Sequence, residues 1–231
     1  MKDIALFEEK TGIYFSDKKL LTQAFIHRSY INENPKSGLT HNERLEFLGD
    51  AVLELVVTDY LYNTYQDSPE GQLTAYRSAL VNAVIISEIA SELGMNDYLL
   101  LSKGEAKDMG KARQYILANT YEAYVGALYL DQGYESARVF IADSLFPRID
   151  EIVEKKLWRD SKSLVQEKAQ EYEGTTPAYK VIAESGPDHD KHFTVAIFFG
   201  EEQIATGKGK SKQEAEQEAA RKALVARDWF D

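Results

Sequence analysis

The chain has 231 residues, 44% hydrophobic and 28% charged, with a formal net charge of −11 and no cysteine. This composition is typical of a globular protein with room for one large domain, or for a medium and a small one. It excludes disulfides, thiolate zinc sites and thiol nucleophiles. No apolar run reaches the roughly 20 residues of a membrane span, so we expect a cytoplasmic protein with no membrane partner.

Helices are expected from Asp3 to about Ile152, where apolar residues recur at spacings of three and four. Breaks are expected at residues 35–38, 67–71 and 102–104, which are rich in Pro, Gly, Ser and Asp. The sequence therefore predicts an all-α domain over residues 1–153.

One of these helices carries acidic residues on a single face. Glu43, Glu46 and Asp50 share a narrow arc of a 3.6-residue period, and apolar side chains point the other way. Carboxylates this close repel one another unless a cation lies between them. A hard divalent ion, Mg²⁺ or its substitute Mn²⁺, suits such oxygen ligands. An ordinary solvated helix face has the same spacing, so spacing alone leaves both interpretations open.

A later helix, beginning near Ile116, carries two more oxygen ligands on one face, Asn119 and Glu122. Its small residues, among them Gly126, allow another helix to approach closely. If the two helices pack together, four side chains converge on one ion: Glu46, Asp50, Asn119 and Glu122.

The pattern changes after a polar, charged run at residues 154–160, which we interpret as a linker. Helix 163–172 is followed by expected strands at 179–183, 192–199 and 203–207. A final helix is predicted from Ser211 to about Ala226, because Ser211 and Glu214 form a capping box. Residues 161–231 are therefore expected to form a small α+β domain of order α-β-β-β-α.

The decamer from His41 to Asp50 resembles the signature of the ribonuclease III family, the double-strand-specific endoribonucleases. Residues 20–30 and 116–123 resemble two neighbouring motifs of this family, and the resemblance covers nearly the whole chain. It implies the family's endonuclease fold and Mg²⁺ held at Glu46, Asp50, Asn119 and Glu122. Asp50 and Glu122 match the residues regarded as indispensable for hydrolysis.

The resemblance also implies how the protein assembles and cuts. Glu43 and Glu70 match acidic positions near the family's RNA-processing centre. Phe47 matches a residue that inserts into a pocket on a second subunit, although an aromatic beside a polar site is often simple packing. A homodimer is expected, in which each subunit cuts one strand to leave staggered 5′-phosphate and 3′-hydroxyl ends. Precursors of ribosomal and other RNAs are the expected substrates, and no organic cofactor is implied.

The C-terminal order resembles a double-stranded-RNA-binding domain, which reads duplex RNA by shape. Net negative charge argues against a nucleic-acid partner, but binding requires only a local basic strip, and three lysines fall within residues 208–212. The residues expected to contact RNA lie on the first helix, in the first hairpin loop and at the start of the last helix: Ser163, Gln166, Glu167, Gln170, His189, Lys210, Ser211 and Lys212.

Two positions depart from the family pattern. Asn119 stands where Asp is usual, so the metal site loses one negative charge; either catalysis tolerates the amide or the site is inactive. Gln213 follows Lys212 where many such domains have two basic residues, which removes a phosphate contact. A duplex-RNA-binding protein without cleavage is therefore the main alternative. A helical scaffold for a basic protein explains neither the decamer nor the C-terminal order.

Overall fold

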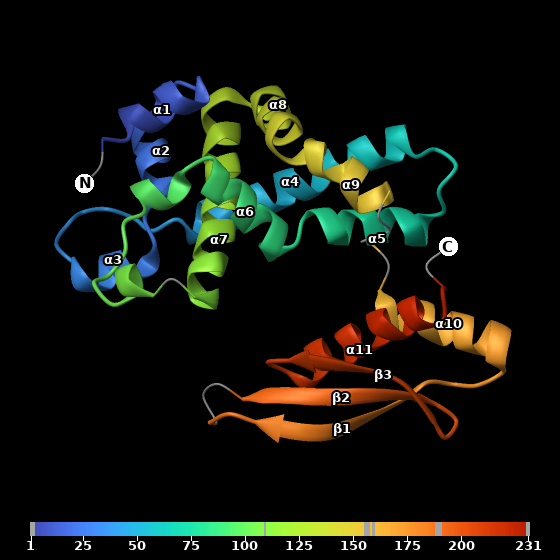
Figure 1. Cartoon of the computed structure of the whole chain (residues 1–231). Coiled ribbons are helices and arrows are strands. Elements are labelled where there is room, and N and C mark those ends of the chain that lie inside the picture. Colours follow the sequence, from blue (N-terminus) through green and yellow to red (C-terminus); the bar gives the residue numbers. More distant parts are fainter. Residues whose placement is uncertain (1–2, 109, 155–157, 159, 188–190, 230–231) are drawn as a thin grey trace. The chain divides into compact units, whose positions relative to one another are not determined.

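The computed structural model describes residues 3–108, 110–154, 158, 160–187 and 191–229. The chain divides into two compact units, residues 1–158 and 159–231 (Figure 1). Of the expected linker 154–160, residues 155–157 and 159 lie outside the described residues. Trp158 packs edge-on against Tyr76, with 5.0 Å between the ring centroids, and so belongs to the first unit.

The first unit is all-α, as predicted. Within its described residues the elements are α1 (Ala5–Thr11), α2 (Lys18–Ala24), α3 (Arg28–Glu33), α4 (Glu43–Thr64), α5 (Glu70–Leu80), α6 (Ala83–Glu92), the 3₁₀ turns η1 (Met95–Tyr98) and η2 (Glu105–Lys107), α7 (Lys111–Gln132), α8 (Tyr134–Leu145), η3 (Phe146–Arg148) and α9 (Ile149–Glu154).

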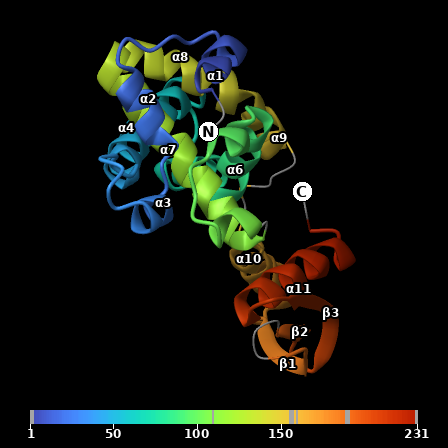
Figure 2. The same cartoon turned by 90° about the vertical axis from the view of Figure 1, so that its left-hand side faces the viewer.

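The long helix α7 forms the centre of this unit. It packs against α2, α4, α6 and α8, and Figure 2 shows it surrounded by other helices. Tyr121, Tyr124 and Leu128 are fully buried on it. Apolar residues occur all around its circumference, as expected of a helix enclosed by the core. Because the core encloses α7, the residues on this helix are held at fixed positions within the unit.

The breaks between helices differ in part from the prediction. Residues 67–71 were expected to form one break, but Glu70 and Gly71 lie in the first turn of α5. Pro69 precedes that turn with φ −66°, a value compatible with helix entry. The acidic side chain of Glu70 also suits the positive end of the helix dipole. The helix therefore starts earlier than the run of turn-forming residues indicates.

The second unit has the predicted α-β-β-β-α order. Its elements are α10 (Ser161–Glu173), β1 (Ala178–Ser185), β2 (His192–Phe199), β3 (Glu202–Gly209) and α11 (Lys212–Ala226). The strands form an antiparallel sheet in the order β1-β2-β3. Helix α11 packs on β3 and β2, and also on α10.

Side-chain caps fix both helix starts in this unit. The Asp160 carboxylate accepts a hydrogen bond from the Ser163 backbone N–H at 2.8 Å, and α10 therefore begins two residues before the predicted start. The predicted capping box at α11 is confirmed. The Ser211 hydroxyl accepts from the Glu214 N–H at 3.1 Å, and the Glu214 carboxylate accepts from the Lys210 N–H at 2.8 Å.

In the described part of the chain, no helix by itself has both the length and the hydropathy needed to cross a membrane. Helices α5 and α6 reach that length and hydropathy only as a pair, with a bend of 44° between them.

Candidate functional site

Helices α4 and α7 cross in backbone contact, because glycines occupy the crossing point. A β-carbon added at Gly49 would lie 1.7 Å from the Glu122 carbonyl oxygen, and one added at Gly126 would lie 2.2 Å from the Leu45 carbonyl oxygen. No larger side chain fits at either position. The crossing therefore brings the acidic face of α4 directly alongside Asn119 and Glu122 of α7.

The electrostatics show that the four predicted ligands lie near one another. Burial raises the pKa of Glu122 to about 8, and the charges of Asp50, Glu46 and Glu54 add to this shift. Burial also raises the pKa of Glu46, with Glu43 and Asp50 adding to the rise and a hydrogen bond from Asn119 opposing it. Half-buried Glu46 and Glu122 thus lie close to exposed Asp50, and their negative charges repel.

This donor set fits a hard divalent cation. Three carboxylates and one amide supply oxygen ligands of the kind that Mg²⁺ prefers, and a cation would relieve the repulsion that raises the pKa of Glu122. Among the residues that the structure describes, no three acidic or imidazole side chains already stand in a metal-binding group. The fit is therefore one of donor chemistry and charge.

The two other predicted acids have different surroundings. Glu43 lies between two basic side chains, with its carboxylate oxygens 3.2 Å from Arg28 Nη1 and 3.6 Å from His41 Nδ1. Glu70 starts α5 and lines a cavity with Thr58 of α4. At about 1.5 Å per residue, Thr58 lies roughly 12 Å along α4 from Asp50, the nearest predicted ligand on that helix, and roughly 22 Å from Glu43. One copy of the chain therefore does not bring Glu70 to the other acids.

Two residues of this region were not predicted from the sequence. Glu54 contributes to the raised pKa of Glu122, and its carboxylate forms an ion pair with Arg77, with 2.9 Å between Oε2 and Nε. Arg77 also donates to the Thr58 hydroxyl at 2.9 Å. The available signal was the position of Glu54 one turn after Asp50 on the same helix. Arg77 had no comparable signal.

Phe47 is 81% exposed, which rules out simple packing within its own unit. Ala51, Leu55, Thr58 and Tyr62 continue its exposed stripe along α4 at spacings of three and four. Next to Tyr62 is a mostly apolar cavity of about 490 Å³ between α4 and α5. An exposed aromatic stripe beside a cavity is typical of a protein interface.

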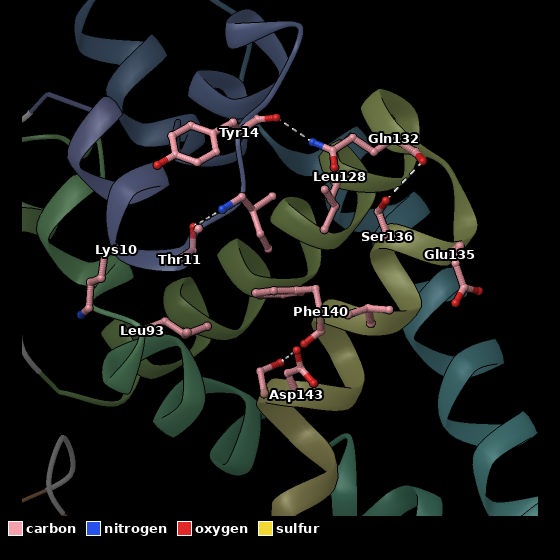
Figure 3. A pocket seen from close by; sticks show the side chains of 14 residues that line it. Lys10, Thr11, Tyr14, Leu93, Leu128, Gln132, Glu135, Ser136, Phe140 and Asp143 are labelled. Atoms are coloured by element: carbon pink, nitrogen blue, oxygen red, sulfur yellow. Dashed lines mark hydrogen bonds between the residues drawn. The ribbon is translucent and has the colours of Figure 1, made fainter.

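A second cavity, of about 530 Å³, lies between α1 and α8 (Figure 3). Its lining includes Leu93, Leu128 and Phe140, with Lys10 and Asp143 among the polar residues. None of the predicted site residues contributes to it.

The second unit exposes most of its predicted RNA contacts. Four lie on α10 and three at the start of α11, and all seven are exposed: Ser163, Gln166, Glu167, Gln170, Lys210, Ser211 and Lys212. The Ser211 hydroxyl caps α11, and Lys212 Nζ lies 5.7 Å from the centre of the Phe193 ring. His189 lies outside the described residues.

Comparisons with known proteins agree with this division. Residues 17–149 match the family described as Ribonuclease-III-like, and residues 161–225 match the double-stranded RNA binding motif. Ribonuclease 3 of Pelotomaculum thermopropionicum is 43% identical over 97% of this chain and 93% of its own length. Ribonuclease 3 of Enterococcus faecalis is 45% identical over 94% of each chain.

A solved structure is similar to the first unit. The nuclease domain of ribonuclease III from Campylobacter jejuni, which has a flexible region involved in dimer formation, is 39% identical with a TM-score of 0.56. The match covers 63% of this chain and 99% of that domain. The family match, the near full-length relatives and the shared fold together show that the chain belongs to the ribonuclease III family, the double-strand-specific endoribonucleases.

Proposed function

We propose that the protein is a homodimeric, Mg²⁺-dependent endoribonuclease that cleaves double-stranded RNA into 5′-phosphate and 3′-hydroxyl ends with staggered cuts. The acid-rich crossing of α4 and α7 carries this proposal, because it gathers carboxylate and amide oxygens of the kind that a divalent cation prefers. Precursors of ribosomal and other structured RNAs are the proposed substrates, and the cytoplasm the proposed compartment. Mn²⁺ is the expected substitute ion, and no organic cofactor is required.

Glu46, Asp50, Asn119 and Glu122 would hold the ion. A bound Mg²⁺ lowers the pKa of water and offsets charge that develops on the phosphate. The protein's part is to supply ionised carboxylates: Glu122, whose pKa is about 8, has to lose its proton. Asn119 donates a hydrogen bond to Glu46, so its own amide oxygen remains as a neutral ligand. Asp50 and Glu122 are the proposed catalytic residues.

The exposed stripe on α4 supports an isologous dimer. Phe47 and Tyr62 lie at nearly equal distances on either side of Leu55. Two copies of α4 packed antiparallel would therefore place Phe47 of one copy beside Tyr62 of the other. The 490 Å³ cavity next to Tyr62 has room for a phenyl ring. Since Glu70 lines that cavity, the same packing would carry Glu70 toward the acidic cluster of the second copy.

The exposed surface of the second unit supports duplex binding. The polar residues of α10 suit the shallow minor groove with its 2′-hydroxyls. The N-terminus of α11, with Lys210, Ser211 and Lys212, suits a phosphate. Because the Ser211 hydroxyl already caps the helix, Ser211 would contribute by forming this helix N-terminus more than by a hydroxyl contact. The proposed contact of His189 rests on the family resemblance alone.

The test is incubation of the chain with end-labelled duplex and single-stranded RNA, with Mg²⁺ or with a chelator. We expect the duplex to be cleaved and the single-stranded RNA to stay intact. Cleavage should occur with Mg²⁺ and not with the chelator, and it should leave ligatable 5′-phosphate ends. Glu122→Gln should abolish cutting, whereas Glu88→Gln on the exposed face of α6 should not. Binding of duplex RNA with no cleavage at any Mg²⁺ concentration would favour the non-catalytic alternative.

A further inference from the structure

An acidic protein that cuts a polyanion needs local positive charge beside its reactive acids. The net charge is −11, and the cluster of Glu46, Asp50 and Glu122 adds to the repulsion that a phosphate would meet. Phosphate contacts in nucleic-acid complexes come largely from Lys and Arg. A cation that serves this purpose has to be exposed and held in a defined orientation close to the cluster.

Arg28 satisfies both conditions. It begins α3, and its side chain is 65% exposed. Its Nη1 lies 3.2 Å from the Glu43 Oε1 atom. A guanidinium carries five N–H donors in a rigid fork. One contact to Glu43 therefore orients the group while leaving further donors for a second anion.

Glu43 has a basic side chain near each of its two oxygens. While Oε1 faces Arg28, Oε2 lies 3.6 Å from His41 Nδ1. A carboxylate flanked in this way by two basic groups is poorly placed as a metal ligand. Its position instead suits a residue that holds the Arg28 guanidinium in place.

Arg28 also lies at a useful distance from the reactive acids. Glu43 precedes Glu46 by about one helical turn and Asp50 by about two, which corresponds to roughly 5 to 11 Å along the axis. An RNA strand with one phosphate at the acidic cluster would extend its neighbouring phosphates across this interval. The exposed face of the guanidinium can bind such a phosphate through two parallel hydrogen bonds.

We propose that Arg28 binds a backbone phosphate of the duplex next to the cleaved bond, and that Glu43 acts by orienting Arg28 rather than by binding the metal. This inference rests on the proposed nuclease function, because it names a further contact of the same site with its RNA substrate. It assigns a substrate-positioning role to Arg28 and an indirect one to Glu43.

The first test is the salt dependence of duplex binding, measured in the full chain with Glu122→Gln to prevent cutting. Arg28→Ala should lower the slope of log affinity against log salt by about 1 for each subunit bound. Affinity at low salt should fall roughly tenfold. Arg28→Lys should keep most of the slope with intermediate affinity, because it keeps the charge but loses the fork.

The matched control is Arg138→Ala. Arg138 is also a partly exposed arginine paired with a glutamate, Glu135 at 2.6 Å, but it lies on α8. Arg138→Ala changes the net charge by the same amount as Arg28→Ala. It should leave the salt slope and the affinity for duplex RNA unchanged. Equal slopes for Arg28→Ala and Arg138→Ala would overturn the proposal.

The second test is a double-mutant cycle on active chain, with the Mg²⁺ concentration for half-maximal rate as an additional readout. Glu43→Gln should raise KM for duplex RNA when Arg28 is present and have little effect in Arg28→Ala. The Mg²⁺ requirement should stay the same throughout. A Glu43→Gln effect that persists without Arg28, or a higher Mg²⁺ requirement, would instead make Glu43 a metal ligand.

The two tests separate the inference from the proposed function. If the chain cuts duplex RNA but Arg28 variants do not change the slope, the inference fails and the nuclease stands. If the chain neither binds nor cuts duplex RNA, both fail. Thermal melts of each variant should match the parent within about 2 °C, since an exposed ion pair contributes little to stability.

Discussion

Glu122 combines partial burial with three neighbouring carboxylates, and both features disfavour its charged form. The pKa of about 8 means that the folded protein keeps a proton between pH 4.5 and 8 that the unfolded chain has released. Unfolding therefore releases a proton in this range. Stability from this group is highest at low pH and falls as the pH rises from about 4.5 to 8.

The corresponding prediction concerns Glu122→Gln in metal-free solution. A neutral amide has no charge to desolvate, so the variant should melt above the parent at pH 8 and close to it at pH 5. Each kcal/mol gained in the free energy of unfolding should raise the melting temperature by about 2–4 °C for a chain of this size. Calorimetry with chelator measures it, with exposed Glu88→Gln as the control. A variant that melts below the parent at pH 8 would refute this description of the site.

At this scale the sequence predicted where ligands lie but not which ion pairs form. Residues at i, i+3 and i+4 of one helix must share a face, so the proximity of Glu46 to Asp50 followed from spacing. Contacts between different helices do not follow from spacing. The pairs Arg28 with Glu43 and Arg77 with Glu54 each join separate helices, and they depend on tertiary packing. The catalytic and metal-binding roles themselves remain predictions.

Among the elements, the crossing of α4 and α7 has the strictest steric requirement. Added β-carbons at Gly49 or Gly126 would overlap backbone atoms of the facing helix, and a backbone cannot rotate aside as a side chain can. Small residues on α7 predicted a close approach, and the structure shows that Gly126 makes it. The partner glycine, Gly49, had no separate signal within the acidic decamer.

Gly126→Ala should therefore force the two helices apart. We expect a loss of about 3 kcal/mol or more in the free energy of unfolding of the first unit, together with loss of cleavage. The matched control is Gly71→Ala in α5, where an added β-carbon meets no atom within 4 Å. That change should be neutral or stabilising by about 0.4–1 kcal/mol. Denaturant melts compare the two, and equal stability of both variants would contradict the described crossing.

One capped helix start followed the sequence and another did not, since α10, capped by Asp160, begins two residues before the expected start. The Ser211 and Glu214 pattern predicted the start of α11 correctly, because both partners are local. The start of α5 was placed wrongly, since turn-forming residues 67–69 and the helical Glu70 form one continuous polar run. Local chemistry predicts caps, whereas the end of a loop also depends on what the next helix packs against.

The whole molecule consists of two units with separate cores, which the change from helical to alternating periodicity indicated. The assembly of the molecule is harder to predict from sequence than its division into units. An apolar stripe can be recognised as exposed only when the burial of its residues is known. Phe47 at 81% exposure and Tyr62 at 70% are the aromatics that the proposed second copy would cover.

Phe47→Ala should weaken the proposed dimer. Truncating an aromatic that fills a pocket on its partner costs about 2 kcal/mol at each of two symmetry-related contacts, so the dissociation constant should rise roughly 1000-fold. Sedimentation equilibrium without RNA measures it. Tyr115→Ala, which removes a 51% exposed aromatic from α7, should leave dimerisation unchanged. If both variants dimerise like the parent, the α4 stripe is not the interface.

The most direct test of the whole account is the Mg²⁺ dependence of duplex cleavage by the chain with Asn119, beside Asn119→Asp. We predict that both chains cut, because the amide keeps an oxygen ligand and three carboxylates remain. The added negative charge should lower the Mg²⁺ concentration for half-maximal rate by roughly tenfold. Cleavage by Asn119→Asp alone, at every Mg²⁺ concentration, would contradict the account and make the chain a duplex-RNA-binding protein without cleavage.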